Sequence, residues 1–241
     1  ELRFEIRQAQ ERREAAIDLY ESLEGHVPSF SEATSVTADP EQLGLRIREL
    51  LGINYLDQIT WGNAYAPFNH WKAAIELKGI LVFQATEVES GELAGFSVSQ
   101  QPLPIITVNI KDFPRARTFT LLHELAHIML RQNCLCNALY FESNRSHDEE
   151  AIEIFCNRVA GATLIPRQFL LEEKIVRDHP IDKKEWKESE IVNLANRYGT
   201  SREALLRRLL ILSKTSKAFY QLKREQYQKE YDELKKIKTP G

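Results

Sequence analysis

The sequence predicts an α+β domain in which a small, mostly antiparallel, three-stranded sheet packs on a pair of helices, with additional helices at both ends. Two observations support this prediction. Short apolar runs rich in β-branched and aromatic residues gather between positions 79 and 110, where glycine and proline separate them. Before and after this region, apolar residues recur at the spacing typical of helices.

Residues 1–60 are predicted to form an N-terminal helical region. One helix is expected over Arg3–Leu23, and Pro40 opens a second over Glu41–Leu51; a glycine follows each of them. Because the chain starts at Glu1 and not at a methionine, this region is interpreted as a candidate linker from a missing upstream domain.

Residues 61–170 are predicted to form the core of the domain, and residues 171–241 a C-terminal helical region. The elements expected in the core are a helix over Asn69–Leu77, strands over Gly79–Ala85, Phe96–Ser99 and Ile105–Ile110, a helix over Ala116–Leu130, a polar loop over Asn133–His147 and a helix over Asp148–Ala162. The helices expected after them cover Gln168–Val176, Ser189–Tyr198, Arg202–Leu212 and Ala218–Ile237.

Composition argues against several classes of protein. The chain has 241 residues with 32 Lys and Arg against 35 Asp and Glu, so its net charge of −3 gives no overall attraction for nucleic acid. No apolar run approaches the roughly 20 residues that span a bilayer, and no signal peptide opens the sequence. Three cysteines do not make a disulfide framework, so the expected compartment is the reducing cytoplasm.

One pentapeptide carries the chemistry that the sequence predicts, His123-Glu124-Leu125-Ala126-His127. Residues i and i+4 of a helix share a face, so both imidazoles can bind one metal ion. Glu124 lies about 100° around the helix from His123 and can reach a water bound to that metal. This is the zincin arrangement. The alternative is a chance match, but two histidines and a glutamate on so apolar a helix are costly unless they are paired or bind metal.

A third protein ligand is expected on the following helix, because a catalytic zinc site takes three protein ligands and keeps one position open. Glu153 is the preferred candidate, and its rivals are Glu149, Glu150 and His147. Asn157 follows Glu153 by one helical turn and can hydrogen-bond a ligand histidine, which favours Glu153. A carboxylate ligand with an amide one turn later is a gluzincin-like layout.

The predicted cofactor is one Zn²⁺ per chain, and a site of two histidines and one carboxylate also suits Mn²⁺ or Fe²⁺. Glu124 is expected to act as the general base, taking the water proton and handing it to the leaving amine. Tyr140, His147 and Arg117 are candidates for stabilising the oxyanion, and the sequence does not choose among them.

The segment from Arg115 to Leu130 resembles the core of the ImmA/IrrE metallopeptidases, whose pattern is roughly Arg-x-x-Phe-Thr-Leu-Ala-His-Glu-x-x-His. The family's second block, Glu-x-x-Ala-Asn-x-Phe-Ala, is matched from Glu153, with Cys156 in place of the usual alanine and Val159 in place of the usual phenylalanine. The family's Leu-x-x-Pro ending is similar to residues 163–166, and residues 77–83, 95–97 and 105–109 resemble the family's sheet. In longer members, a helix-turn-helix domain of the Xre type precedes the peptidase.

The resemblance implies an endopeptidase that cleaves one regulatory protein, a helix-turn-helix repressor or a cognate small protein, in stress response, mobile-element control or phage defence. The alternative is a toxin, or a metal-binding sensor or transcriptional regulator, of a two-gene toxin–antitoxin module with little general proteolysis. Nucleic acid is a candidate activating signal, or a partner of the missing upstream domain. No membrane partner is expected.

Cys134 and Cys136 follow the metal-binding helix directly. Either thiolate could occupy the open metal position and inhibit the enzyme. A pair of ordinary loop thiols is the preferred interpretation.

The C-terminal helices have an alternative interpretation as a nucleic-acid-binding element. Residues 191–212 have helix-turn-helix spacing, but their leucines favour packing against the peptidase, with Arg202, Arg207 and Arg208 on the outside. The segment Lys217–Lys238 has an excess of basic residues, for which a solvated helical face is preferred to contact with nucleic acid.

Overall fold

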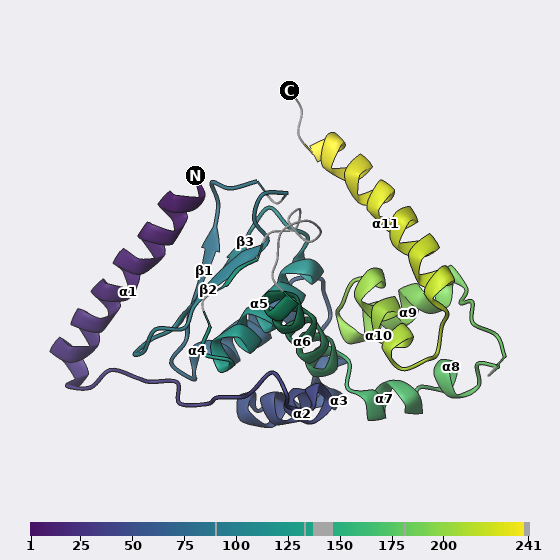
Figure 1. Ribbon diagram of the computed structural model, residues 1–241, viewed down its shortest axis with the longest axis horizontal. Helices are drawn as coiled ribbons and strands as arrows, with labels where there is room; N and C mark the ends of the chain where they lie inside the picture. Colours follow the sequence, from purple (N-terminus) through teal and green to yellow (C-terminus); the bar gives the residue numbers. More distant parts are fainter. Residues whose placement is uncertain (90, 133, 137–146, 181, 239–241) are drawn as a thin grey trace.

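The computed structural model describes residues 1–89, 91–132, 134–136, 147–180 and 182–238, with the backbone alone at 134–136 and 235–238. Its helices are α1 (Leu2–Glu24), α2 (Pro40–Leu51), α3 (Tyr55–Gln58), α4 (Ala66–Glu76), α5 (Pro114–Met129), α6 (His147–Leu164), α7 (Arg167–Glu172), α8 (Lys174–Arg177), α9 (Glu188–Tyr198), α10 (Arg202–Ile211) and α11 (Lys217–Lys238). Its strands are β1 (Leu81–Ala85), β2 (Gly95–Val98), β3 (Ile105–Asn109) and β4 (Cys134–Cys136). Figure 1 shows their arrangement.

The sheet is mixed and has four strands in the order β1-β3-β2-β4. β1 and β3 are parallel, whereas β2 runs antiparallel to both β3 and β4. The prediction of a three-stranded, mostly antiparallel sheet is therefore wrong. β3 inserts between the two strands that precede it in the chain, an order that local periodicity does not encode. β4 lies in the segment predicted as a polar loop, and three residues are too few to produce a recognisable alternation.

The two faces of the sheet are covered by different helices, with α1 on one side and α4 and α5 on the other (Figure 1). Side chains alternate along a strand, so neighbours face opposite sides. Phe96 and Ile105 pack with Ala9 of α1 in a small cluster, whereas Ile106 and Val108 belong to the main core with α5. The sheet is thus a layer between the N-terminal helix and the helix that carries His123-Glu124.

Helix α1 has a polar sequence and buries few apolar side chains. Its attachment to the sheet therefore depends on polar contacts. The buried Glu5 carboxylate accepts the backbone N–H groups of Thr86 and Glu87, each at 3.0 Å. The buried Arg13 guanidinium donates to the carbonyl oxygens of Pro102 and Leu103 at the other end of the sheet.

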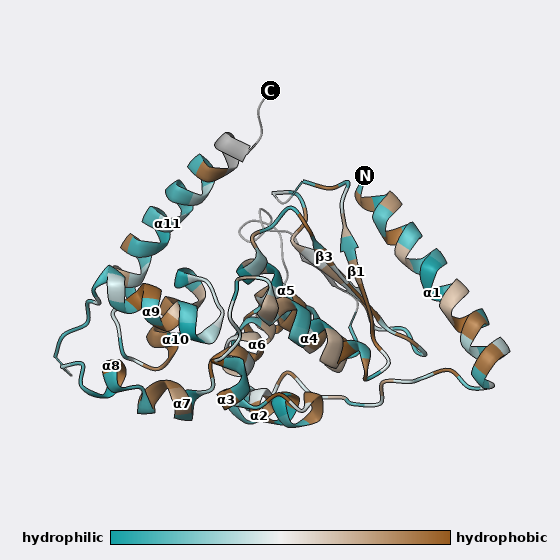
Figure 2. Cartoon of the chain, turned by 180° about the vertical axis from the view of Figure 1, so that it is seen from behind, coloured by the Kyte–Doolittle hydropathy of each residue, from teal (hydrophilic) through white to brown (hydrophobic). Residues whose placement is uncertain are grey.

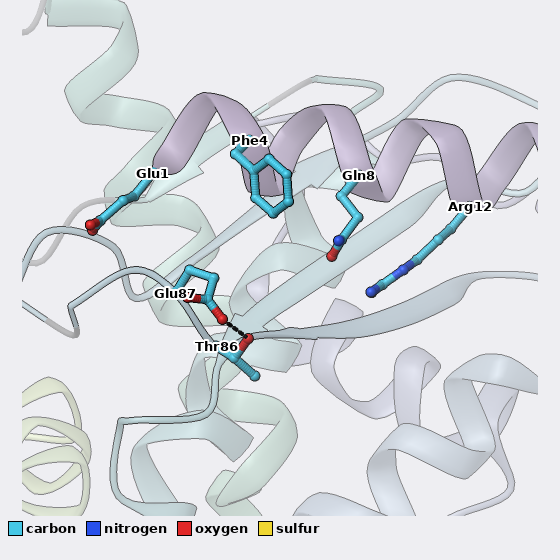
Figure 3. Close-up of a pocket in the computed structure, with 6 residues that line it drawn as sticks. All are labelled: Glu1, Phe4, Gln8, Arg12, Thr86 and Glu87. Carbon is cyan, nitrogen blue, oxygen red and sulfur yellow. Dashed lines mark hydrogen bonds between the residues drawn. The ribbon is translucent and has the colours of Figure 1, made fainter.

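A surface pocket opens beside α1 (Figure 3). Three side chains of α1, those of Phe4, Gln8 and Arg12, line it together with Glu1 before the helix and Thr86 and Glu87 after β1. None of these residues belongs to the predicted metal site, so this pocket is separate from the chemistry discussed below.

Helix α6 packs against both α5 and α2 in the main core. Gly44 of α2 lies so close to α6 that a Cβ there would be 2.9 Å from backbone atoms of Ala162 and Thr163. Asp39 caps α2 by accepting the N–H of Glu41. The close packing of α2 against α6 at Gly44 holds α6 in place beside α5.

The helix predicted over Gln168–Val176 is two short helices, α7 and α8, so this prediction is wrong. The break is at Glu173, whose backbone is extended (φ −57°, ψ 129°). Its carboxylate accepts hydrogen bonds from Tyr55 Oη at 2.7 Å and Arg197 Nε at 2.6 Å. These long-range bonds favour an extended residue where the local sequence favours a helix.

The α9–α10 pair packs on the main core and places one predicted surface residue inside it. Arg208 is 1% exposed; it donates to the Ile165 carbonyl at 2.8 Å and makes two bonds of 2.5 Å to the Glu41 carboxylate. The prediction that Arg208 lies outside is therefore wrong, because an ion pair with α2 satisfies its charge. Arg202 and Arg207 are partly exposed.

Helix α11 is mainly hydrophilic (Figure 2) and attaches to the body through aromatic residues. Phe219, Tyr220 and Tyr227 are buried in the main core. Farther along, Tyr231 Oη donates to Asp112 Oδ1 at 2.9 Å, and its ring packs edge-on against Phe113. Among the described residues, none of the helices is both long and apolar enough to span a membrane.

Candidate metal centre

Helix α5 brings two imidazoles to one point. Pro114 occupies its first turn, where a missing N–H costs nothing, and the helix continues without interruption to Met129. His123 and His127, four residues apart, are 4% and 2% exposed, and their Nε2 atoms are 3.0 Å apart. Two buried imidazoles in such contact are expected where both can bind one ion.

Helix α6 supplies a carboxylate to the same point. Glu153 is 7% exposed, and its oxygens lie 3.4 Å from His123 Nε2 and 3.4 Å from His127 Nε2. Burial acts to raise the pKa of Glu153, but hydrogen bonds and charge from the two imidazoles outweigh it and hold that pKa well below the usual range. Glu153 is therefore ionised, as a metal ligand must be.

The spacing of these three donors fits a metal ion. In a tetrahedral site with bonds of about 2.0–2.1 Å, neighbouring ligand atoms are about 3.3 Å apart. The two Nε2 atoms are 3.0 Å apart, and each lies 3.4 Å from a different oxygen of Glu153, distances close to that edge length. The described residues thus form a buried His–His–Glu group that could hold a metal ion.

Glu124 lies beside this group and is fully buried. The hydroxyl of Ser97, on β2, donates to Glu124 Oε2 at 2.7 Å. Sequence reasoning missed Ser97, because 27 residues separate the two positions. A signal was present, since β2 has small residues at 95 and 97 where an apolar face would be expected.

Gly95 lets α5 approach β2 closely enough for that contact. A Cβ at this position would be 2.7 Å from Thr120 Cγ2 and 2.8 Å from the Thr107 carbonyl oxygen, distances that side chains do not tolerate. It would also lie 3.5 Å from Glu124 Oε1. The Glu124 carboxylate therefore lies against β2 between Gly95 and Ser97.

A buried thiol adjoins the group on the α6 side. Cys156 is fully buried and is a free cysteine. Burial raises the pKa of the Cys156 thiol, and a hydrogen bond with His127 only partly offsets this. Sequence reasoning treated Cys156 as an apolar replacement and did not predict its contact with His127.

A comparison with protein families decides the identity of the domain. A family model named Peptidase_M78, described as the IrrE N-terminal-like domain, matches residues 75–210, more than half of the chain. The chain belongs to the ImmA/IrrE metallopeptidase family. The resemblance inferred from the sequence is thereby confirmed. Comparison with curated proteins gives no match.

The rival ligands in this ImmA/IrrE domain lie at the start of α6. His147, Glu149 and Glu150 are exposed in its first turn, whereas Glu153 is buried next to both histidines. Asn157 is partly exposed one turn after Glu153, and its proposed bond to a ligand histidine remains a prediction.

The candidates for oxyanion stabilisation have different surroundings. Arg117 is buried; it donates to Gln84 Oε1 at 3.0 Å and packs its guanidinium over the ring of Phe68, 4.9 Å from the centroid. These contacts give Arg117 a packing role between α5, β1 and α4. His147 is exposed, and Tyr140 lies outside the described residues.

Cys134 and Cys136, interpreted from the sequence as ordinary loop thiols with metal inhibition as the alternative, form the ends of strand β4 of the ImmA/IrrE domain. In the backbone register, Cys134 pairs with Ser97 and Cys136 pairs with Gly95. Their side chains lie outside the described part of the chain, so inhibition by either thiolate remains an untested alternative.

Proposed function

We propose that this ImmA/IrrE family member is a zinc-dependent, gluzincin-like endopeptidase that cleaves one regulatory protein. The observation that carries the proposal is the buried His123–His127–Glu153 group with the Glu124 carboxylate beside it. Three charged or polar donors gathered inside an apolar core are costly unless they bind something. Their spacing supports a metal ion in that place.

The proposed roles follow from the positions of the side chains. His123, His127 and Glu153 hold the metal, which when bound supplies Lewis acidity toward a carbonyl oxygen and lowers the pKa of a water. Glu124 is adjacent to His123 in the chain and is not part of the donor group, so its carboxylate can accept a proton from the attacking water. Glu124 then returns that proton to the amine that leaves.

The proposed substrate is a helix-turn-helix repressor, or a cognate small protein, encoded beside this gene. The family assignment supports a peptidase and hence a protein substrate. The choice of a repressor rests on the resemblance to ImmA/IrrE peptidases, in which cleavage of such a protein releases the genes that it silences. Zinc is proposed before manganese or iron because two histidines and one glutamate, with one position left open, are a ligand set of catalytic zinc sites.

The proposal is tested by co-expressing the chain with the neighbouring repressor. Wild type is compared with Glu124→Gln, which keeps the size of the side chain but removes its basic carboxylate. Glu150→Gln is the matched control, since Glu150 is an exposed carboxylate in the first turn of α6. Cleavage is followed by mass spectrometry of the repressor, and the metal content of each purified variant is measured.

We expect wild type and Glu150→Gln to cut the repressor at one site. Glu124→Gln should retain the metal and lose about 100-fold or more in rate, since general-base catalysis contributes about 10²–10⁴-fold. Metal in every variant without cleavage by wild type would contradict the peptidase proposal and favour a metal-binding sensor or a toxin.

A further inference from the structure

Ser97 places a hydroxyl on the face of the sheet that packs against α5. Its neighbours on that face, Val82, Ile106 and Val108, belong to the main apolar core. Ser97 is 2% exposed, and a buried hydroxyl costs free energy unless it is hydrogen-bonded. Its partner is the Glu124 carboxylate, not a backbone carbonyl of its own strand.

We propose that Ser97 is a positioning residue that holds the Glu124 carboxylate in its reactive orientation. This inference rests on the proposed function, in which Glu124 is the general base. The 2.7 Å distance from Ser97 Oγ to Glu124 Oε2 is that of a strong hydrogen bond from a hydroxyl to a carboxylate.

The Glu124 carboxylate lies against β2 at two positions, Gly95 and Ser97. Residues i and i+2 of a strand face the same side, so the two positions act together. Ser97 donates to Oε2, and Oε1 lies near Gly95, 3.5 Å from where a Cβ would be. The hydrogen bond therefore fixes one oxygen of the Glu124 carboxylate, and the other oxygen lies against the strand at Gly95.

Orientation matters here because a glutamate has three rotatable side-chain bonds. A general base must be held within about 0.5 Å of its productive position, and supporting hydrogen bonds are the usual means. His123 and His127 need no such help from β2, since helix geometry and Glu153 fix them. Loss of the Ser97 hydroxyl should therefore change proton transfer and leave metal binding intact.

The experiment compares wild type, Ser97→Ala and Thr215→Val. Thr215 is a buried residue whose hydroxyl donates to the Lys184 carbonyl away from the metal group, so this variant also loses one partly buried hydrogen bond. The substrate is the purified neighbouring repressor, and metal affinity is measured by zinc titration. Should Ser97→Ala fail to fold, Ser97→Cys keeps the volume of the side chain and weakens the donor.

For Ser97→Ala we expect kcat to fall by about 10–100-fold, the range found when residues supporting a metal site are removed. KM and zinc affinity should stay within about two-fold of wild type. Thr215→Val should keep wild-type kcat. An unchanged kcat, or a fall in kcat that parallels a loss of zinc, would overturn the proposal.

A crystal structure of Ser97→Ala provides a readout that does not depend on cleavage. We expect Glu124 to adopt a new rotamer or several conformers. A single, unchanged Glu124 rotamer would show that Ser97 does not position the carboxylate, whatever the activity. If Glu124 moves but wild type cleaves nothing, the positioning inference stands in its structural part and the proposed function fails.

Discussion

Glu153 is the residue on which the proposed metal centre depends most, because it is the donor that comes from a second helix. A glutamine there keeps the size but loses the charge that the two imidazoles stabilise. We expect Glu153→Gln to lower zinc affinity by more than the roughly 10–100-fold typical of residues that only support ligands. Zinc titration of the purified variant measures this loss.

The matched control for Glu153→Gln is Glu150→Gln, one helical turn earlier in α6. Glu150 is exposed and was a rival ligand in the sequence, so the pair distinguishes the two assignments. Wild-type zinc affinity is expected for Glu150→Gln. The opposite pattern, with loss at Glu150 and none at Glu153, would assign the third ligand to Glu150.

Residues near the site were predictable where their relation is local. His123, Glu124 and His127 lie within five consecutive residues of one helix, and helix geometry alone places both histidines on the same face. The hydrogen bond of Ser97 with Glu124 was not predictable, because it depends on how β2 packs on α5. The Cys156 contact with His127 was missed for the same reason, since it joins two helices.

At the scale of elements, close packing of α5 on β2 depends on the absence of a side chain at Gly95. We expect Gly95→Ala to destabilise the fold by about 1–3 kcal/mol, because the added methyl meets Thr120 and the Thr107 carbonyl at less than 3.0 Å. Urea denaturation measures the free energy of unfolding.

Gly161→Ala is the control for that experiment, because no described atom lies within 4 Å of a Cβ built there. Gly161 lies in α6, where alanine is favoured over glycine, so this variant should be more stable by about 0.5–1 kcal/mol. If both variants were equally stable, the contact between α5 and β2 would not be tight.

The elements with a clear apolar pattern were predicted, whereas the pairing of the strands and the shortest elements were not. The helices that carry the proposed metal donors and the first three strands are present where the sequence places them. The parallel pairing of β1 with β3 and the short β4 depend on contacts between distant segments. The break at Glu173 likewise depends on Tyr55 and Arg197, both far away in the sequence.

At the scale of the whole molecule, the main core joins the segment before α2 to the last helix, α11. The main hydrophobic cluster extends from Phe30 to Tyr227 and includes α5 and α6. The predicted regions 1–60, 61–170 and 171–241 therefore share buried surface, and their boundaries remain a prediction. We expect calorimetry to give a single cooperative unfolding transition for the full chain.

The ion pair between Arg208 and Glu41 joins α10 to α2 across 167 positions of sequence. Removing one partner of a buried pair leaves an uncompensated charge and costs about 3–5 kcal/mol. Glu41 is 26% exposed in its side chain, so we expect Glu41→Gln to cost about 3 kcal/mol, at the lower end of that range. For a chain of this size, that corresponds to a fall in Tm of about 6–12 °C.

Glu32→Gln is the control for the loss of an ion pair, because Glu32 pairs with an exposed Arg46 at the surface. Such pairs contribute about 0–1 kcal/mol, so its Tm should fall by no more than about 4 °C. If α10 is coupled to the peptidase core as its contacts indicate, Glu41→Gln lowers the one transition of the whole chain. Two separate transitions, with only one of them shifted by Glu41→Gln, would instead mean that the C-terminal helices unfold independently of α5 and α6.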